Sequence, residues 1–330
     1  MSTRLLIGVL LALSITFAQA QTFSFGLWGD MPYQKAGDAP KIPALLKSIN
    51  RSDIAFSIYD GDIKDGSSRC TDDIYASALT MFGQLVKPVV YVPGDNEWTD
   101  CHRLNNGGYD GLERLGYLRK TMFPTADSLG QRQMPLLHQG KFGEMNFENT
   151  RFSHGGIVFV SLNLPGSNNN KILDEKDCAY KSARTAAQCD ASNEEYLARD
   201  AANVSWMQQA FAAAKNRKAR GLVLVFQADP GFDLPETEDI DESQGPRFSG
   251  YRNFINHVIA ETEQFPGQVL LVHGDTHFFK LDKPLYSPTK LLANLTRLQT
   301  FGSPMIHWVR VTVDPKTANV FAVQPVIVTQ

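Results

Sequence analysis

The sequence lacks any block of like charge. Its 32 Lys and Arg residues nearly balance 35 Asp and Glu residues, which leaves a formal net charge of -3 over 330 residues. Proteins whose main partner is nucleic acid usually carry a basic patch or arm, so we expect no such partner. Internal repeats, low-complexity tracts and a recognisable linker are also absent. We therefore expect a single large domain over residues 21–330.

Long apolar runs are almost absent as well. The exception is LLIGVLLALSITFA, close to the N-terminus, which is too short for an ordinary membrane span. Arg4 precedes it, and the small residues AQA follow just before Gln21, as at a signal-peptidase site. An uncleaved anchor would need a basic stop-transfer flank, which does not follow. We predict a signal peptide at residues 1–20 cleaved near Ala20, no stable membrane span, and a secreted or periplasmic location.

Cysteine is scarce, with only four residues in the chain: Cys70, Cys101, Cys178 and Cys189. Their spacing does not match a zinc cluster, and an exported protein meets an oxidising compartment that favours disulfides. Four cysteines allow three connectivities. The natural pairing joins the first two residues to each other and the last two to each other.

Short apolar runs alternate with stretches of helical periodicity. The five runs that we expect to be strands are residues 22–28, 54–59, 88–92, 221–226 and 268–272. Apolar residues at helical spacing lie between them, around residues 42–49, 204–214 and 254–259. This alternation predicts an α/β domain. Residues 307–314 and 319–328 are expected to form an antiparallel hairpin that closes a sheet.

Two polar stretches interrupt this pattern, at about residues 163–200 and 228–250. The first contains the turn-rich segment NLPGSNNN and the second cysteine pair, so we expect a surface insertion stapled by a disulfide. The second is acidic. Loops of this length inside a compact domain usually bind or cover a ligand.

Gly-Asp follows an apolar run four times, at Gly29-Asp30, Gly61-Asp62, Gly94-Asp95 and Gly274-Asp275. Functional groups gather where parallel strands end, and glycine allows the chain to turn sharply there. Four carboxylates at one edge would repel each other unless cations hold them together. His273 and His277 add nitrogen donors beside the last pair. The pattern predicts a metal site.

These segments, in the order GDMPY, GDIKDG, GDNE, VFQADP and GDTH, resemble the motifs of the calcineurin-like metallophosphoesterases, which include the purple acid phosphatases. The resemblance spans residues 23 to about 315. It implies an α/β fold, a four-layer αββα sandwich of two mixed β-sheets flanked by helices. It also implies hydrolysis of a small-molecule phosphate mono- or diester by metal-bound hydroxide, with two divalent ions clamping the phosphate.

Position by position, the resemblance implies a set of metal ligands. Asp30 and His277 would bind the first metal, Asp62 would bridge both metals, and Asp95 would bind the second. Asp275 stands where the family has the first His of its last motif. Gln227 or Asp229 would stand in for a His expected near VFQADP.

Several family histidines are replaced. Pro32 stands where the first motif has His, and Asn96 where the third motif has the His that assists the leaving group. Because oxygen donors take the place of nitrogen donors, we expect Mg, Mn or Ca to be preferred over Zn or Fe. The substitutes can still coordinate or hydrogen-bond, which is typical of a remodelled site.

A proton donor for the leaving group would have to come from elsewhere. His102, His273 and Asn96 are the candidate catalytic residues near the third and fifth motifs. Arg69, Arg103 and Asn96 are candidates for binding phosphate oxygens. Without a protonated donor, esters with good leaving groups would be favoured.

Two other functions remain open. A non-catalytic metal- or ligand-binding protein could retain the phosphoesterase fold, and the lost histidine favours this alternative. A metal-free hydrolase with paired carboxylates, as in glycosidases, is disfavoured because the acids follow the metallophosphoesterase order. Substrate choice is expected to depend on residues 163–200 and 228–250.

Overall fold

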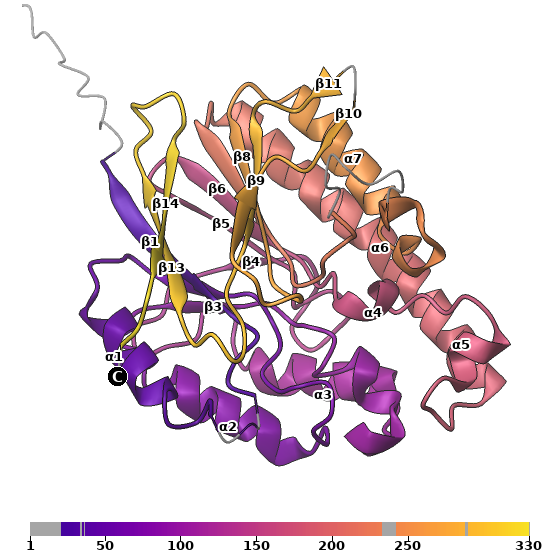
Figure 1. The fold of residues 1–330 in the computed structure, drawn as a ribbon. Helices are drawn as coiled ribbons and strands as arrows, with labels where there is room; N and C mark the ends of the chain where they lie inside the picture. The colour runs from indigo at the N-terminus through magenta and orange to yellow at the C-terminus, as the bar shows by residue number, and fades with distance from the viewer. Residues whose placement is uncertain (1–20, 34, 36, 233–241, 288–289, 330) are drawn as a thin grey trace, which may run out of the picture.

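The computed structural model describes residues 21–330 except 34, 36, 233–241, 288–289 and 330 (Figure 1). The predicted signal peptide at residues 1–20 lies outside the described residues. So does the part of the second predicted insertion that spans 233–241.

The first sheet has five strands in the order β14-β13-β1-β2-β3. Its core strands β1, β2 and β3 are parallel, and β13 pairs antiparallel with both β1 and β14. The predicted C-terminal hairpin is therefore confirmed, and it closes this sheet. The strands are β1 (Phe23–Trp28), β2 (Ser57–Tyr59), β3 (Val89–Tyr91), β13 (Trp308–Val313) and β14 (Phe321–Val326).

The second sheet has seven strands in the order β4-β5-β6-β7-β8-β12-β9. Its central strands β6, β7, β8 and β12 are parallel, while its edges are antiparallel. The strands are β4 (Leu137–His138), β5 (Thr150–His154), β6 (Ile157–Ser161), β7 (Gly221–Val225), β8 (Gln268–His273), β9 (Lys280–Asp282) and β12 (Leu295–Gln299). A separate ribbon consists of β10 (Tyr286–Ser287) and β11 (Lys290–Leu291).

Helices cover the outer faces of both sheets (Figure 1). On the side of the first sheet lie α1 (Ile42–Arg51), α2 (Asp72–Phe82) and α3 (Gly111–Met122). On the second sheet lie α6 (Ala186–Asn216) and α7 (Arg252–Glu263). The shorter helices are α4 (Gly166–Asn169), α5 (Glu175–Ala179), η1 (Thr99–His102), η2 (Leu104–Asn106), η3 (Glu242–Gln244) and η4 (Pro246–Phe248).

Alternation along β7 shows how the layers are built. Val223 and Val225 belong to the core between the sheets, whereas Leu222 and Leu224 pack under α6 and α7. Because successive side chains of a strand point to opposite faces, a continuous apolar run can contribute residues to the cores on both sides of the sheet. The predicted four-layer αββα arrangement is confirmed.

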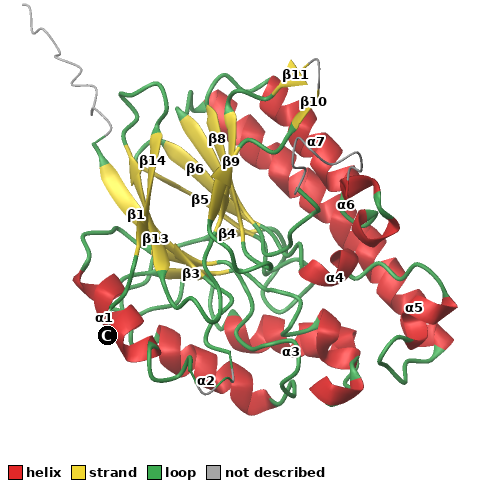
Figure 2. Cartoon of the chain, viewed as in Figure 1, coloured by secondary structure: helices red, strands yellow, loops and turns green. Residues whose placement is uncertain are grey.

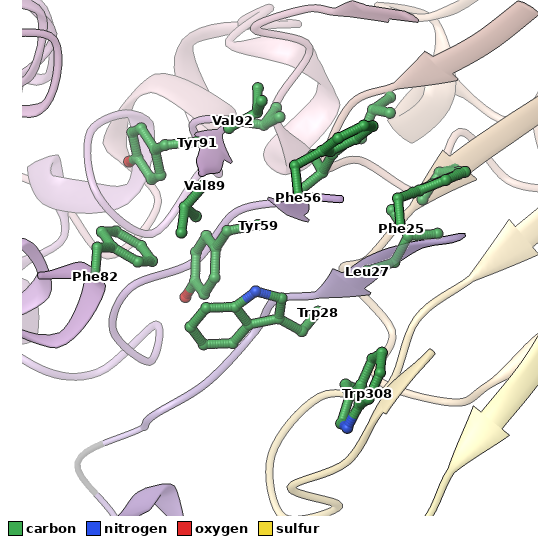
Figure 3. Close-up of a cluster of buried hydrophobic side chains, with 14 of the residues drawn as sticks. Phe25, Leu27, Trp28, Phe56, Tyr59, Phe82, Val89, Tyr91, Val92 and Trp308 are labelled. Carbon is green, nitrogen blue, oxygen red and sulfur yellow. The ribbon is translucent and has the colours of Figure 1, made fainter. Parts of the chain in front are cut away.

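Aromatic side chains fix the first sheet next to its site loops (Figure 3). Trp28 and Tyr59 are fully buried and meet edge to face, with ring centroids 4.8 Å apart. The Tyr59 hydroxyl lies 2.8 Å from the backbone oxygens of Met31 and of Asp62. This phenol therefore joins the loops that follow β1 and β2.

One expectation about the first insertion differs from the structure. Residues 186–200, expected to be irregular, form the start of the long helix α6. A capping box explains the start, since the Thr185 hydroxyl accepts from the Gln188 backbone N–H and the Gln188 side chain accepts in return. The polar residues of this half are buried in pairs, as for Arg199 with Glu195. This half has few apolar residues at helical spacing, so the sequence pattern did not predict a helix here.

Both expected disulfides are present, Cys70–Cys101 and Cys178–Cys189. Among the described residues, no helix is long and apolar enough to cross a membrane.

Candidate functional site

The predicted carboxylates lie at the carboxyl ends of parallel strands in both sheets. Asp30 follows β1, Asp62 follows β2, Asp95 follows β3, and Asp275 follows β8. Figure 2 shows the loops from both sheets gathering at the same end of the molecule, beside α4. Asp30, Asp62 and Asp95 are at most 6% exposed, so they share a space that water barely enters.

The backbone at these positions is unusual. Asp30, Asp62, Asp275 and His277 have positive φ values of 49°, 63°, 75° and 69°. Residues other than glycine rarely adopt this region, and such strain concentrates at functional sites.

The glycines of the motifs each make room for a side chain from another motif. A Cβ on Gly94 would lie 2.0 Å from Asp62 Oδ1, and a Cβ on Gly274 would lie 2.1 Å from Asp30 Oδ2. Glycine is therefore required at these positions for close packing of the loops.

Tyr33 places its oxygen among the residues of the first predicted metal position. Its Oη lies 3.1 Å from Asp62 Oδ2, 3.5 Å from Asp30 Oδ1 and 3.0 Å from His277 Nε2. The His277 Nδ1 donates to the Ser303 carbonyl over 2.7 Å, so the Nε2 of the neutral ring carries a lone pair. Three acceptors therefore face one phenol proton.

Gln227 lies between the carboxylates of the second predicted metal position. Its Nε2 lies 3.1 Å from Asp95 Oδ1 and 3.3 Å from Asp62 Oδ2, while its Oε1 accepts from the Gly166 backbone N–H over 2.6 Å. Asn96 adds donors to Asp62, with its backbone N at 3.2 Å and its Nδ2 at 2.6 Å. Neutral donors therefore surround Asp62.

Glu97 and Ser167 support this half of the site. The buried Glu97 carboxylate accepts from the backbone N–H of Asp62 and of Gly94 and from the Tyr91 hydroxyl. The Ser167 hydroxyl lies 2.9 Å from Asp95 Oδ2. Residues 167–170 all have positive φ, so α4 is a left-handed turn that carries Ser167 toward the carboxylates.

The concentration of buried carboxylates favours their protonated forms. Burial raises the pKa of Asp30, Asp62 and Asp275 well above the usual value, and repulsion by neighbouring carboxylates raises it further. Burial also raises the pKa of Asp60 and of Asp100 to about 7. A cation placed among these groups would stabilise their ionised forms.

The spacing of three atoms at the first metal position is close to that of a cation site. Ligands about 2.1 Å from one ion and 90–110° apart are separated by roughly 3.0–3.4 Å. Tyr33 Oη, Asp30 Oδ1 and His277 Nε2 form a triangle with sides of 3.5, 3.6 and 3.0 Å, which is close to that spacing. One corner of this triangle is a tyrosine oxygen.

The six predicted ligands do not form a ready-made cluster. In the described part of the chain, no three His, Cys, Asp or Glu side chains are arranged to hold a metal ion. The second position does not fit, because Gln227 presents an N–H donor where a ligand would need a lone pair. The prediction of Gln227 as a metal ligand is not supported by this geometry. Its neighbour Asp229 turns instead to the backbone N–H groups of Gly231 and Phe232.

A cavity of about 630 Å³ opens beside these groups. Tyr33, Asp62, Asp95, Asp275 and His277 line it on the carboxylate side. Four cationic side chains also line it: Arg103, Lys171, Arg184 and Arg247. Arg103 is held in place by Asp100 at 2.5 Å and donates to Ser167 over 3.1 Å. Acidic residues lie among them as well, namely Asp100, Asp177 and Glu242. The cavity lining thus combines buried carboxylates with cationic side chains.

The remaining predicted residues divide between the cavity and other places. Asn96 and His102 line the cavity. His273 does not, because its buried ring turns toward Arg297, 3.4 Å away, and toward Phe226. Arg69 is exposed and also lies outside the lining. The structure therefore gives His273 and Arg69 no contact with this site.

Several lining residues were not predicted as site residues. Ser167 lies in the turn-rich segment NLPGSNNN, which was predicted only as part of a surface insertion. Lys171 and Arg184 belong to the first insertion, where a basic residue in a polar stretch gives no signal of its own. Tyr33 was not predicted either, since its contact with His277 joins residues 244 positions apart in the sequence.

Comparisons with known proteins bear on the fold. No protein-family model matches the sequence, and no curated protein matches it. The solved structure of PhoD is similar to this chain with a TM-score of 0.56 and 12% identity, over 92% of this chain and 68% of PhoD. A 5′-nucleotidase from Candida albicans SC5314 has a TM-score of 0.46 and 11% identity, over 92% of this chain and 50% of the nucleotidase. The likeness to PhoD, together with the two mixed sheets and their flanking helices, shows that this chain has the calcineurin-like phosphoesterase fold.

Proposed function

We propose that this protein is an exported hydrolase of small phosphate mono- or diesters that depends on a divalent cation. The observation that carries the proposal is the cavity, whose lining contains both buried carboxylates at the strand ends and four Arg and Lys side chains. Such a pairing suits a cation and a phosphate bound side by side. The two disulfides support export, since they form in oxidising compartments.

Asp30, His277 and the Tyr33 oxygen would hold the cation, with Asp62 beside them. A bound cation would supply positive charge against the phosphate oxygens and make water a better nucleophile. Mg, Mn or Ca would be preferred, because oxygen atoms make up most of this donor set.

The chain's own residues would position the substrate. Arg103 can bind phosphate oxygens because Asp100 and Ser167 fix its guanidinium at the cavity wall. Asn96 presents its amide at the same wall while donating to Asp62. Loss of Arg103 should therefore weaken substrate binding more than cation binding.

His102 would not supply a proton at neutral pH. Burial, together with the nearby Arg184 and Arg103, lowers the pKa of His102 to about 3. The neutral ring keeps one N–H donor and one acceptor nitrogen, but it lacks the labile proton of an imidazolium. The role proposed for His102 is therefore hydrogen bonding to the substrate and not protonation of the leaving group.

A second function is favoured by one specific observation. Asn96, Gln227 and Tyr33 already place neutral donors around Asp62, as expected if the fold had been retained for binding alone. In that case the protein would bind a phosphate or a cation without turnover.

Metal analysis of the purified protein separates these functions, combined with hydrolysis of an aryl phosphate and an aryl phosphodiester under Mg, Mn, Ca and Zn. We expect bound metal and turnover that Asp62→Asn abolishes, whereas Asp73→Asn, on the exposed start of α2, changes neither. Bound ligand without turnover would support the binding protein. Absence of metal and of turnover, with no effect of Asp62→Asn, would rule out the hydrolase.

A further inference from the structure

The space between Asp62 and Asp95 is taken by an amide. Gln227 Nε2 lies 3.3 Å from Asp62 Oδ2 and 3.1 Å from Asp95 Oδ1, so one N–H₂ group faces both carboxylates. A cation shared by these two carboxylates would need the same place. The amide and a second cation therefore exclude each other.

The orientation of the amide is determined by its other end. The Gly166 backbone N–H points at Gln227 Oε1 over 2.6 Å, and a backbone N–H can only donate. Turning the amide over would set two donors against each other at Gly166 and two acceptors against each other at Asp95. Gln227 thus cannot offer its oxygen to a cation without losing both contacts.

Packing also holds the stem of this side chain. Gln227 is fully buried, and a Cβ on Gly61 would lie 2.5 Å from its Cγ and 2.8 Å from its Cβ. The Gly61 backbone therefore packs directly against the glutamine stem. A cation at this place would have to move a side chain that is both buried and hydrogen-bonded at its two ends.

The two halves of the site differ in their balance of donors. At Asp62 and Asp95, donors come from Asn96, Gln227 and Ser167, and no buried oxygen of these two carboxylates lacks a partner in the described structure. Around Tyr33, three acceptors share a single phenol proton, and Asp30 accepts besides from the Asp275 backbone N–H. Side-chain N–H and O–H groups from three residues thus occupy the second half, whereas one phenol is the side-chain donor of the first.

We propose that this protein binds one divalent cation, not two, and that the Gln227 amide nitrogen occupies the place of the second. This inference rests on the proposed cation-dependent function. In the absence of a second cation, positive charge against the phosphate would come from Arg103 and the other cations of the cavity wall.

The stoichiometry of Mn²⁺ binding tests the proposal directly. The metal-free full chain is dialysed against Mn²⁺, the bound ion is counted by elemental analysis, and its electron paramagnetic resonance spectrum is recorded. We expect one ion per chain with the spectrum of an isolated Mn²⁺. Two ions with an exchange-coupled spectrum would overturn this inference but leave the proposed hydrolase intact. No bound ion would overturn both.

Gln227→Glu provides the gain-of-binding test. Its carboxylate has the shape of the amide, so one oxygen can still accept from Gly166 while the other faces Asp62 and Asp95. We expect the variant to bind two Mn²⁺ ions per chain. Gln139→Glu is the control. Gln139 is half-buried, its amide is likewise paired at both ends, with Ala202 and Asn149, and it lies outside the cavity lining. This variant should keep one ion.

A folded Gln227→Glu protein that still binds one ion would contradict the role of the amide. Thermal melting establishes whether the variant folds. If it does not, the stoichiometry of the unmodified chain decides the proposal alone.

Discussion

At the scale of single residues, Tyr33 has the most distinctive position. Its oxygen is in contact with Asp30, Asp62 and His277 although it has one proton to share. Tyr33→Phe removes this oxygen and leaves the ring in place. We expect affinity for Mn²⁺ to fall by about tenfold or more, as when a ligand or its immediate support is lost. Calorimetric titration of the metal-free protein measures this change.

Tyr117→Phe is the control for that variant. Tyr117 packs against Arg114 on α3, far from the cavity lining, so its hydroxyl should not affect cation binding. Equal affinities for the Tyr33→Phe protein and the unmodified protein would exclude the tyrosine oxygen from the cation site.

Asp60 is expected to control the pH dependence of stability. Burial raises the pKa of Asp60 from 3.8 to about 7, and its Oδ1 is buried without a partner while its Oδ2 accepts from Thr300. Because the folded chain holds this proton more tightly than the unfolded chain, the stabilisation is complete below about pH 3.8. It is lost as pH rises through about 7.

In metal-free buffer, the free energy of unfolding should therefore fall between about pH 4 and pH 7, with Asp60 contributing on the order of 4 kcal/mol over this range. Asp60→Asn should reduce this slope, because asparagine does not titrate. Urea unfolding at several pH values measures it, with Asp73→Asn as the exposed control. An unchanged slope in Asp60→Asn would show that Asp60 is already ionised in the folded state.

At the scale of elements, the Cys70–Cys101 disulfide joins the segments that follow the second and third motifs. Both cysteines are fully buried, and their sulfurs lie 3.5 and 3.7 Å from the Asn96 carbonyl oxygen. The bond should limit how far the loops carrying Asp62 and Asp95 can separate. Its loss should loosen cation binding before the chain unfolds.

Replacing Cys70 and Cys101 together by Ala should weaken Mn²⁺ binding at temperatures where circular dichroism still reports a folded chain. The same exchange at Cys178 and Cys189, which joins α5 to the start of α6, should leave Mn²⁺ affinity within about twofold. Unchanged Mn²⁺ affinity in the variant that lacks Cys70 and Cys101 would mean that the loops hold their positions without the disulfide.

The elements also show why part of the site could be predicted. Asp30, Asp62 and Asp95 come directly after strands whose apolar runs are local features of the sequence, so the positions of these carboxylates followed from the strand ends. The contact of Gln227 with Gly166 depends on segments 61 residues apart. No local pattern states which end of the amide faces the carboxylates. The predicted ligand role of Gln227 therefore depended only on its place in the order of the family motifs.

Helix α6 illustrates a second limit of local patterns. Its later part was predicted from the spacing of Val204, Met207 and Phe211, whereas residues 186–200 looked like a loop. That half buries polar groups in pairs, and Arg199 is 1% exposed while bound to Glu195 and Asn163. Periodicity of apolar residues cannot detect a helix whose buried face is polar.

At the scale of the whole molecule, the cavity is formed by loops from both sheets together with the first insertion. The motif order predicted the carboxylates of the cavity, but not that Lys171 and Arg184 would line the same cavity. His273, predicted from its place at a strand end, points to the other face of β8 because the strand alternates its side chains. A residue one position earlier or later on this strand would point to the face on which the site lies.

The protonation states of the groups that line the cavity predict how the rate of hydrolysis should depend on the leaving group of the substrate. His102 and His277 are the two histidines of the described lining, and burial lowers the pKa of both. At neutral pH neither ring has a proton to spare for a departing alkoxide. A bound cation would hold the cavity carboxyls Asp62, Asp100 and Asp275 in their ionised forms, so they would not supply the proton either. In the proposed cation-loaded hydrolase, the leaving group must therefore carry away its own negative charge.

We expect kcat/KM to fall on the order of 100-fold or more from 4-nitrophenyl phosphate to phenyl phosphate, the factor that a general acid would otherwise recover. His102→Gln should leave this ratio unchanged, since glutamine keeps the hydrogen-bonding capacity and an unprotonated imidazole contributes no acid. A ratio near one in the unmodified protein would reveal a proton donor in the cavity. If the unmodified protein hydrolysed both esters equally well and His102→Gln then discriminated between them, His102 would be the donor. Bound substrate would in that case raise the pKa of His102 far above the value of about 3 that burial gives it.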